Sequence, residues 1–289
     1  MPGVQVPQGP PLIRRYRHGV AGARISGVVA LVLACLLWGT TGTTATFLPD
    51  DISPLAVGAA TMGIGGLLLL ITAPRLSSGV LRDPLGRRWA AIGALGVFVY
   101  PLAFYTGMDL VGVAVGNVVA LGSGPVFAAL IEWVVERDGL SARWAVSTVI
   151  AVGGIGLLAT GRQEGGAAAS SASAVLGVGV GLLAGLAYAL YTYASSRAIR
   201  AGHPSRGVMG GMFGLGALPL LAVLVVIGGP LTQSWTSVGL SAYLVLGPMF
   251  LAYLLFGIGL RSVRSSAATT ITLLGANLAE DVMGEVGFG

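Results

Sequence analysis

The chain has 289 residues, of which 55% are apolar and only 9% are charged. Soluble domains usually carry about 25% charged residues, so this composition excludes an ordinary soluble protein. The formal net charge of +5 includes 16 basic residues, all of them Arg. Because these Arg residues lie between apolar stretches, they are interpreted as membrane-topology signals, and no nucleic-acid partner is expected.

The first 25 residues contain four Pro and four Arg and are expected to form a disordered, basic cytosolic tail. The apolar run that follows is too long for a signal peptide and predicts a membrane anchor. An apolar stretch of roughly 20 residues crosses a membrane as a helix, since lipid offers the backbone no hydrogen-bond partners. We therefore predict an all-α membrane protein with about nine transmembrane helices, at 26–48, 53–73, 88–109, 112–135, 143–161, 174–196, 206–228, 236–260 and 265–286.

The placement of arginine predicts the orientation of these helices, because cytoplasmic loops carry an excess of basic residues. With a cytosolic N-terminus and one crossing per stretch, 15 of the 16 Arg lie on the cytosolic side and only Arg162 lies outside. The outer loops carry Asp50, Asp51, Asp109 and Glu164 instead. The sequence thus predicts a multi-pass protein of the inner (cytoplasmic) membrane.

A shift of 150 residues pairs the first four stretches with the sixth to the ninth, without a net gap. The acidic loop Pro49–Pro54 then corresponds to the basic loop Ile199–Arg206, so the two copies are expected to face opposite ways. Such an inverted repeat is a transporter architecture with its solute site near the membrane midplane. We assign residues 26–161 to a first repeat of five helices, 162–173 to an external linker, and 174–289 to a second, incomplete repeat of about four helices.

Three short motifs suggest a family. Trp38-Gly39-Thr40 lies in the first stretch, Pro125 lies in the fourth, and Glu136-Arg137 follows at the cytosolic end of the fourth. Together with the two five-helix halves, they resemble the EamA-type branch of the drug/metabolite transporter superfamily over about residues 26–275. The resemblance implies ten helices, both termini in the cytosol, and transport, often efflux, of a small organic solute such as an amino acid, metabolite or drug-like compound.

The end of the sequence departs from that pattern. The shift of 150 places a tenth helix at 292–311, beyond residue 289, and Glu280, Asp281 and Glu285 interrupt the ninth stretch. Carboxylates are costly inside a membrane. Two interpretations stay open: a transporter that lacks the tenth helix, and a truncated fragment or half of a larger assembly that does not transport.

Polar and aromatic residues at mid-span are the candidate site, because such groups are costly elsewhere in lipid. Trp38 and Thr41 lie three residues apart on one helix face, and the shift of 150 maps them onto Tyr188 and Tyr191. Helix packing by the same aromatics remains the alternative. The candidate cavity residues are Trp38, Thr41, Tyr100, Asn117, Ser123, Tyr188, Tyr191, Tyr253, Thr269 and Thr272.

Small residues at four-residue spacing predict close helix packing rather than a binding site. They form three series: Gly177/Gly181/Gly185, Gly112/Gly116 and Gly210/Gly214. The single cysteine, Cys35, lies within the first stretch and is expected to be a small buried hydrophobe.

Charge is scarce in the predicted spans. Glu132 is a candidate proton relay, with pairing to Arg137 or Arg143 as the alternative. The otherwise neutral candidate cavity favours uncharged, zwitterionic or amphipathic solutes. The expected partners are this solute and membrane lipid, and a homodimer is left open.

An intramembrane enzyme is the rival class. Gly122-Ser123-Gly124 resembles a nucleophile motif, but a serine nucleophile needs a base. The two histidines, His18 and His203, both lie in predicted cytosolic segments, and no Cys, His or acidic cluster in the membrane is suited to a metal. We therefore expect neither an enzyme nor a metal or other cofactor.

Overall fold

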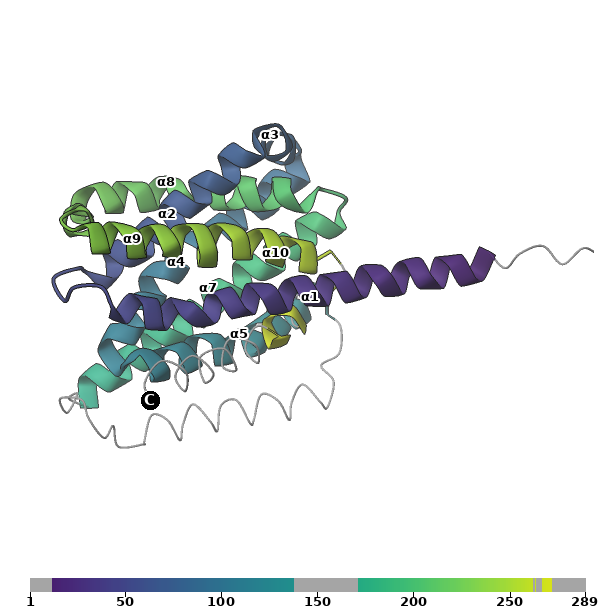
Figure 1. The fold of residues 1–289 in the computed structure, drawn as a ribbon. Helices are drawn as coiled ribbons and strands as arrows, with labels where there is room; N and C mark the ends of the chain where they lie inside the picture. The colour runs from purple at the N-terminus through teal and green to yellow at the C-terminus, as the bar shows by residue number, and fades with distance from the viewer. Residues whose placement is uncertain (1–11, 138–170, 262, 264–266, 272–289) are drawn as a thin grey trace, which may run out of the picture.

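The computed structural model describes residues 12–137, 171–261, 263 and 267–271, with the backbone alone for 12–26 and 171. Over these residues the chain is a bundle of long helices joined by short connections (Figure 1). In chain order the elements are α1 (Leu12–Thr46), α2 (Pro54–Thr72), α3 (Pro74–Arg82), α4 (Pro84–Val111), α5 (Val113–Glu136), α7 (Ser171–Arg200), α8 (Ser205–Ile227), the 3₁₀ turn η1 (Gly229–Thr232), α9 (Trp235–Leu244), the π-helix η2 (Val245–Leu251) and α10 (Ala252–Gly259).

The all-α membrane fold is confirmed. Within the described residues, seven helical segments are long and apolar enough to cross a membrane, at Gly27–Thr46, Pro54–Thr72, Pro84–Val111, Val113–Glu136, Ala172–Arg200, Ser205–Ile227 and Trp235–Gly259. Each coincides with a predicted stretch. The stretch predicted at 143–161 lies outside the described residues, and only 267–271 of the stretch at 265–286 lie within them.

Proline and a capping carboxylate explain where several helices begin. Pro54, Pro74 and Pro84 occupy the first turn of their helices, where the missing N–H is not needed. Asp83 caps α4: its Oδ2 accepts from the Gly86 amide at 2.7 Å and lies 3.1 Å from His203 Nε2. The Gly86 hydrogen bond, and after it His203, holds the pKa of the Asp83 carboxyl below its usual value.

The prediction of a disordered tail over residues 1–25 is wrong for its second half, because α1 begins at Leu12. All four Pro of the tail precede Leu12, and the rest contains no helix-breaking proline. In Figure 1 this part of α1 projects beyond the other helices. A 35-residue helix therefore combines the basic segment with the first span.

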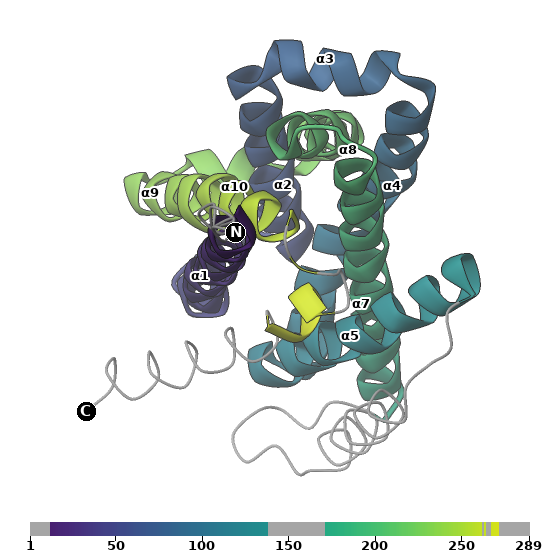
Figure 2. The same ribbon diagram turned by 90° about the vertical axis from the view of Figure 1, so that its right-hand side faces the viewer.

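The cytosolic connection predicted between the second and third spans contains a helix of its own, α3. Ser77 and Val80, three residues apart, are buried on one face, while Arg75 and Arg82 are exposed. Figure 2 shows α3 lying across the end of α8 between α2 and α4. The basic segment is thus an amphipathic helix that rests on the second repeat.

The second spans of the two repeats run antiparallel against each other. Gly66 of α2 lies against the Phe213 carbonyl of α8, and Leu69, further along α2, lies against Gly210, earlier on α8. Equivalent helices of the two repeats therefore point in opposite directions, as an inverted repeat requires.

The remaining helices form two groups on either side of α2 and α8 (Figure 2). In the first bundle (α4, α5 and α7), Gly96 of α4 lies against the Ala187 carbonyl of α7. In the second bundle (α1, α9, η2 and α10), Gly259 of α10 lies against Leu31 of α1. The third span (α4) thus packs on the sixth (α7). The counterpart of the third span is span eight, which is Trp235–Gly259 (α9, η2 and α10), and it packs on the first span (α1). This is the pairing expected of a pseudo-twofold axis.

The predicted glycine packing surfaces are confirmed, except that Gly112 lies outside a helix, as the N-cap of α5 with φ 87°. On α7, Gly177 faces Leu110 of α4, and further along the same helix Gly181 and Gly185 face α5. Gly116 lies against Met108, and Gly210 and Gly214 lie against α2. In each case a Cβ atom would meet a neighbouring helix, so the missing side chain permits close approach.

Candidate functional site

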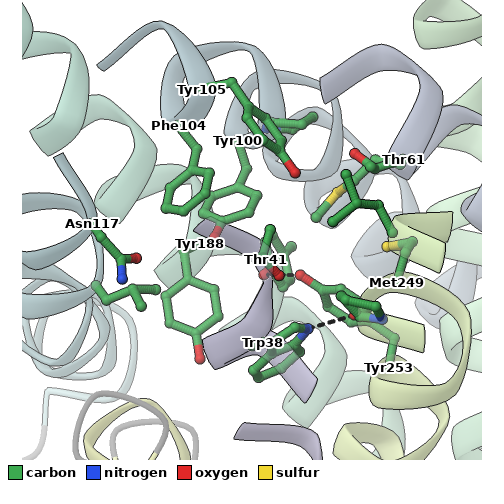
Figure 3. A pocket seen from close by; sticks show the side chains of 16 residues that line it. Trp38, Thr41, Thr61, Tyr100, Phe104, Tyr105, Asn117, Tyr188, Met249 and Tyr253 are labelled. Atoms are coloured by element: carbon green, nitrogen blue, oxygen red, sulfur yellow. Dashed lines mark hydrogen bonds between the residues drawn. The ribbon is translucent and has the colours of Figure 1, made fainter. Parts of the chain in front are cut away.

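A cavity of about 60 Å³ lies between the two bundles (Figure 3). Its walls come from α1, α2, α4, α5, α7 and span eight, so both repeats contribute. The lining residues are Trp38, Thr41, Thr61, Met62, Tyr100, Pro101, Phe104, Tyr105, Asn117, Leu121, Tyr188, Tyr191, Leu244, Pro248, Met249 and Tyr253.

Most of the candidate residues from the sequence meet at this cavity. Those that line it are Trp38, Thr41, Tyr100, Asn117, Tyr188, Tyr191 and Tyr253. The pairs Trp38/Thr41 and Tyr188/Tyr191, which the shift of 150 relates, therefore lie around one space although they come from different repeats.

Four other candidates do not line the cavity or cannot be placed. Ser123 is buried, but its hydroxyl donates to the Ala120 carbonyl at 3.2 Å at the contact between α5 and α7. Thr269 is fully buried elsewhere, and Thr272 lies outside the described residues. Glu132 lies on α5 one turn before Glu136 and is likewise absent from the cavity wall.

Trp38 is held by an unusual turn in span eight. Pro248 interrupts this span, and the surrounding residues form the π-helix η2. The N–H of Ala252, which a regular α-helix would direct to the Pro248 carbonyl, donates to the Gly247 and Met249 carbonyls instead. The indole Nε1 of Trp38 donates to the Pro248 carbonyl at 2.7 Å. The π-helix thus offers a carbonyl that fixes the Trp38 ring in the cavity wall.

Tyrosines from the two bundles meet at one end of the cavity. The hydroxyls of Tyr191, from α7, and Tyr253, from α10, lie 2.6 Å apart. Trp38 packs edge-on against Tyr253 with 5.0 Å between ring centres, and Tyr100 packs edge-on against Tyr191 at 5.7 Å. Edge-to-face contacts of this kind are favourable and set the ring orientations.

Among the residues that the structure describes, those that line the cavity carry no charged side chain. Its polar groups are tyrosine and threonine hydroxyls, the Asn117 amide and the Trp38 indole, set among aromatic rings and methionines. Burying an unpaired charge among such groups is costly, whereas neutral groups find both hydrogen bonds and ring contacts. The arrangement therefore suits an uncharged or internally compensated molecule better than a strong ion.

Sequence reasoning missed several cavity residues. Thr61 lies mid-span in α2, but the shift of 150 maps it onto Gly211, so the repeat supplied no second signal. Its hydroxyl donates to the Val57 carbonyl at 2.9 Å within its own helix. Phe104 stacks on Tyr100 with 5.3 Å between ring centres, and its spacing of four from Tyr100 was the available clue.

The acidic residue of the Glu136-Arg137 motif links α5 to α7. Glu136 Oε1 accepts from Arg197 Nη1 at 3.0 Å and from the Tyr193 hydroxyl at 3.2 Å. The Arg197 guanidinium also lies 5.6 Å from the ring centre of Trp89 on α4. Arg137 ends α5 in a left-handed conformation with φ 56°. This cluster ties the three helices of the first bundle together at one end.

Comparisons with known proteins agree with this architecture. The model of the EamA-like transporter family matches twice, at residues 25–160 and 175–276. The chain is 32% identical over 251 residues to the uncharacterized transporter YwfM of Bacillus subtilis (strain 168), covering 84% of this chain and 79% of that protein. A crystal structure with 20% identity and a TM-score of 0.69 covers 92% of this chain and 90% of its own, and so shares the fold.

Proposed function

Because the chain belongs to the EamA-like transporter family, we propose that it moves a small organic solute across the inner (cytoplasmic) membrane. In this proposal the solute binds in the cavity between the two bundles, and alternating access exposes that cavity to either side. The observation that carries the proposal is the convergence of Trp38/Thr41 and Tyr188/Tyr191, equivalent pairs from the two repeats, on one cavity.

The chemistry of the wall supports a class of solute. Rings of Trp38 and Tyr188 offer contacts to apolar or aromatic groups, and Asn117 offers both a donor and an acceptor. Because the described lining residues include no charged side chain, we propose an uncharged, zwitterionic or amphipathic solute such as an amino acid, metabolite or drug-like compound.

We propose export as the direction, with the N-terminus in the cytosol. The basic residues around α3 and the connection between α7 and α8 then face the cytosol, in accordance with the excess of basic residues in cytoplasmic loops. In that orientation Thr41 and Asn117 lie towards the outer ends of α1 and α5, so the cavity lies in the outer half of the membrane.

Metabolite profiling tests the transport proposal. Cells with and without the gene are compared for solutes in the medium and in the cytosol, and the exported solute is expected to accumulate in the medium only with the gene. Asn117→Leu, which removes the amide from the cavity, should lower the flux by about two- to tenfold, the contribution of about one hydrogen bond. Membrane abundance should not change.

Val225→Ala serves as the matched control, because Val225 is 85% exposed on the outer surface of α8. This variant should transport at the parental rate. An identical extracellular profile with and without the gene would contradict the transport proposal. A parental flux in Asn117→Leu would contradict the proposal that the solute binds in this cavity.

A further inference from the structure

We propose that the hydrogen bond between Tyr191 and Tyr253 is the inner gate of the cavity, so that its loss favours the state open towards the cytosol. The inference rests on the proposed function and orientation. Tyr191 stands on α7 in the first bundle, and Tyr253 stands on α10 in the second. Their hydroxyls, 2.6 Å apart, join the two bundles directly.

The two tyrosines mark the point where the cavity ends. Tyr191 and Tyr253 both line the cavity. The residues that follow them by one or two turns on α7 and α10, towards the predicted cytosolic side, do not line it. Ala194 and Ala198 continue the face of α7 that carries Tyr191, and Phe256 follows Tyr253 on α10. All three are 0% exposed. Solid packing thus begins immediately beyond the tyrosine pair.

Helix α8 closes the space behind the pair. The Phe213 ring lies 4.5 Å from the Tyr253 ring centre and 5.5 Å from that of Tyr191. Met212 fills the notch at Gly93 of the first bundle. Methionine side chains are flexible and repack with little strain. The layer can therefore rearrange once the two bundles separate, and this separation breaks the hydrogen bond between the Tyr191 and Tyr253 hydroxyls.

The position of the tyrosine pair also couples solute binding in the cavity to opening of the gate. Both tyrosines line the cavity and hydrogen-bond each other within it. A solute whose polar group bonds to either hydroxyl replaces the bond between the bundles with a bond to itself. Neutral hydrogen bonds exchange at small net cost, so such a replacement removes a bond that stabilises the closed state and shifts the population towards the open state. A phenylalanine at either position removes the bond in the same way.

Cysteine accessibility tests this gate without any transport measurement. Cys35, the single cysteine of the sequence, is buried and is first replaced by Ala. Ala198→Cys then reports the predicted cytosolic side, and Thr61→Cys reports the cavity side. Rates of reaction with a water-soluble maleimide are measured on the full chain in detergent. Tyr253→Phe should speed labelling of Ala198→Cys by roughly two- to tenfold and slow that of Thr61→Cys. Tyr191→Phe should do the same.

Tyr243→Phe is the matched control. The Tyr243 hydroxyl lies 2.7 Å from Thr40 Oγ1, so this variant also removes a hydroxyl contact between helices, but within the second bundle. It should leave the Ala198→Cys rate unchanged. An unchanged rate of Ala198→Cys labelling in both gate variants would overturn the proposal. Faster labelling of both Ala198→Cys and Thr61→Cys would also overturn it, because it would indicate that the whole helix bundle is less tightly packed. A failure to find any transported solute would leave these rates unaffected and so bears only on the proposed function.

Discussion

At the scale of single residues, Trp38 shows how one side chain depends on a distant backbone irregularity. Its indole donates to the Pro248 carbonyl at 2.7 Å, and its ring packs edge-on against Tyr253 and Phe256. Proline removes a backbone donor from span eight, and the π-helix around it presents a carbonyl to α1. The orientation of a cavity residue in the first repeat is therefore set by a helix defect in the second.

Trp38→Phe should lower the free energy of unfolding by about 1 kcal/mol, because it keeps an aromatic ring but removes the donor to a partly buried carbonyl. Chemical unfolding in detergent measures the difference. Trp235→Phe is the control, since Trp235 is 91% exposed at the start of α9, and its effect should stay within about 0.5 kcal/mol. Equal stability of the two variants would show that the indole hydrogen bond contributes nothing.

At the scale of elements, glycine controls how closely the helices approach. A Cβ atom at Gly96 of α4 would lie 2.6 Å from the Ala187 carbonyl of α7. Because the clash would be with a backbone atom, it is relieved only if α4 and α7 move apart. Both helices supply tyrosines to the cavity, Tyr100 from α4 and Tyr191 from α7, so their separation sets its width.

Gly96→Ala should lower the free energy of unfolding by about 1–3 kcal/mol, the usual cost of overpacking. Gly179→Ala on α7 is the control, because nothing lies within 4 Å of its added Cβ. There alanine should be neutral or stabilise the helix by up to about 1 kcal/mol. The measurement is the unfolding midpoint in detergent, and a stabilising Gly96→Ala would mean that α4 and α7 tolerate separation.

At the scale of the whole molecule, the two repeats share one architecture in opposite orientations. Equivalent second spans α2 and α8 cross antiparallel, and the family model matches each repeat separately. The lining of the cavity is less symmetric than the helices: Thr61 corresponds to Gly211, and Tyr253 corresponds to Ala103. The helix arrangement is thus repeated, whereas most of the side chains that line the cavity differ from their counterparts in the other repeat.

The orientation in the membrane is predicted from the arginines and can be tested on intact cells. In a Cys35→Ala background, single cysteines at Ser53 and Ser234 should react with an impermeant thiol reagent from outside. Cysteines at Gly79 and Ala201, both exposed in the structure, should react only after the membrane is permeabilised. The outer pair shows that the reagent reacts on intact cells, and the inner pair shows that it does not enter them. Labelling of Gly79→Cys or Ala201→Cys on sealed cells would contradict the predicted orientation.

The sequence by itself determined the seven spans now described, the repeat and the membrane-protein class. These features follow from local rules: lipid demands an apolar helix of sufficient length at each crossing, whatever the neighbouring helices do. The glycine spacings predicted packing surfaces for the same reason, since a missing side chain permits close contact on whichever helix carries it. Seven of the candidate cavity residues were found because they are polar or aromatic at mid-span.

Only the tertiary structure decided which face of each span lines the cavity. The spans are apolar nearly all round, so their sequences carry little sign of which side faces lipid and which faces protein. Ser123 and Thr61 are both mid-span hydroxyls, yet the first lies at a helix contact and the second lines the cavity. The π-helix that offers its carbonyl to Trp38, the pairing of Glu136 with Arg197 and the meeting of Tyr191 with Tyr253 all join residues more than 60 positions apart. Such contacts depend on the relative rotation and height of packed helices, which no single span encodes.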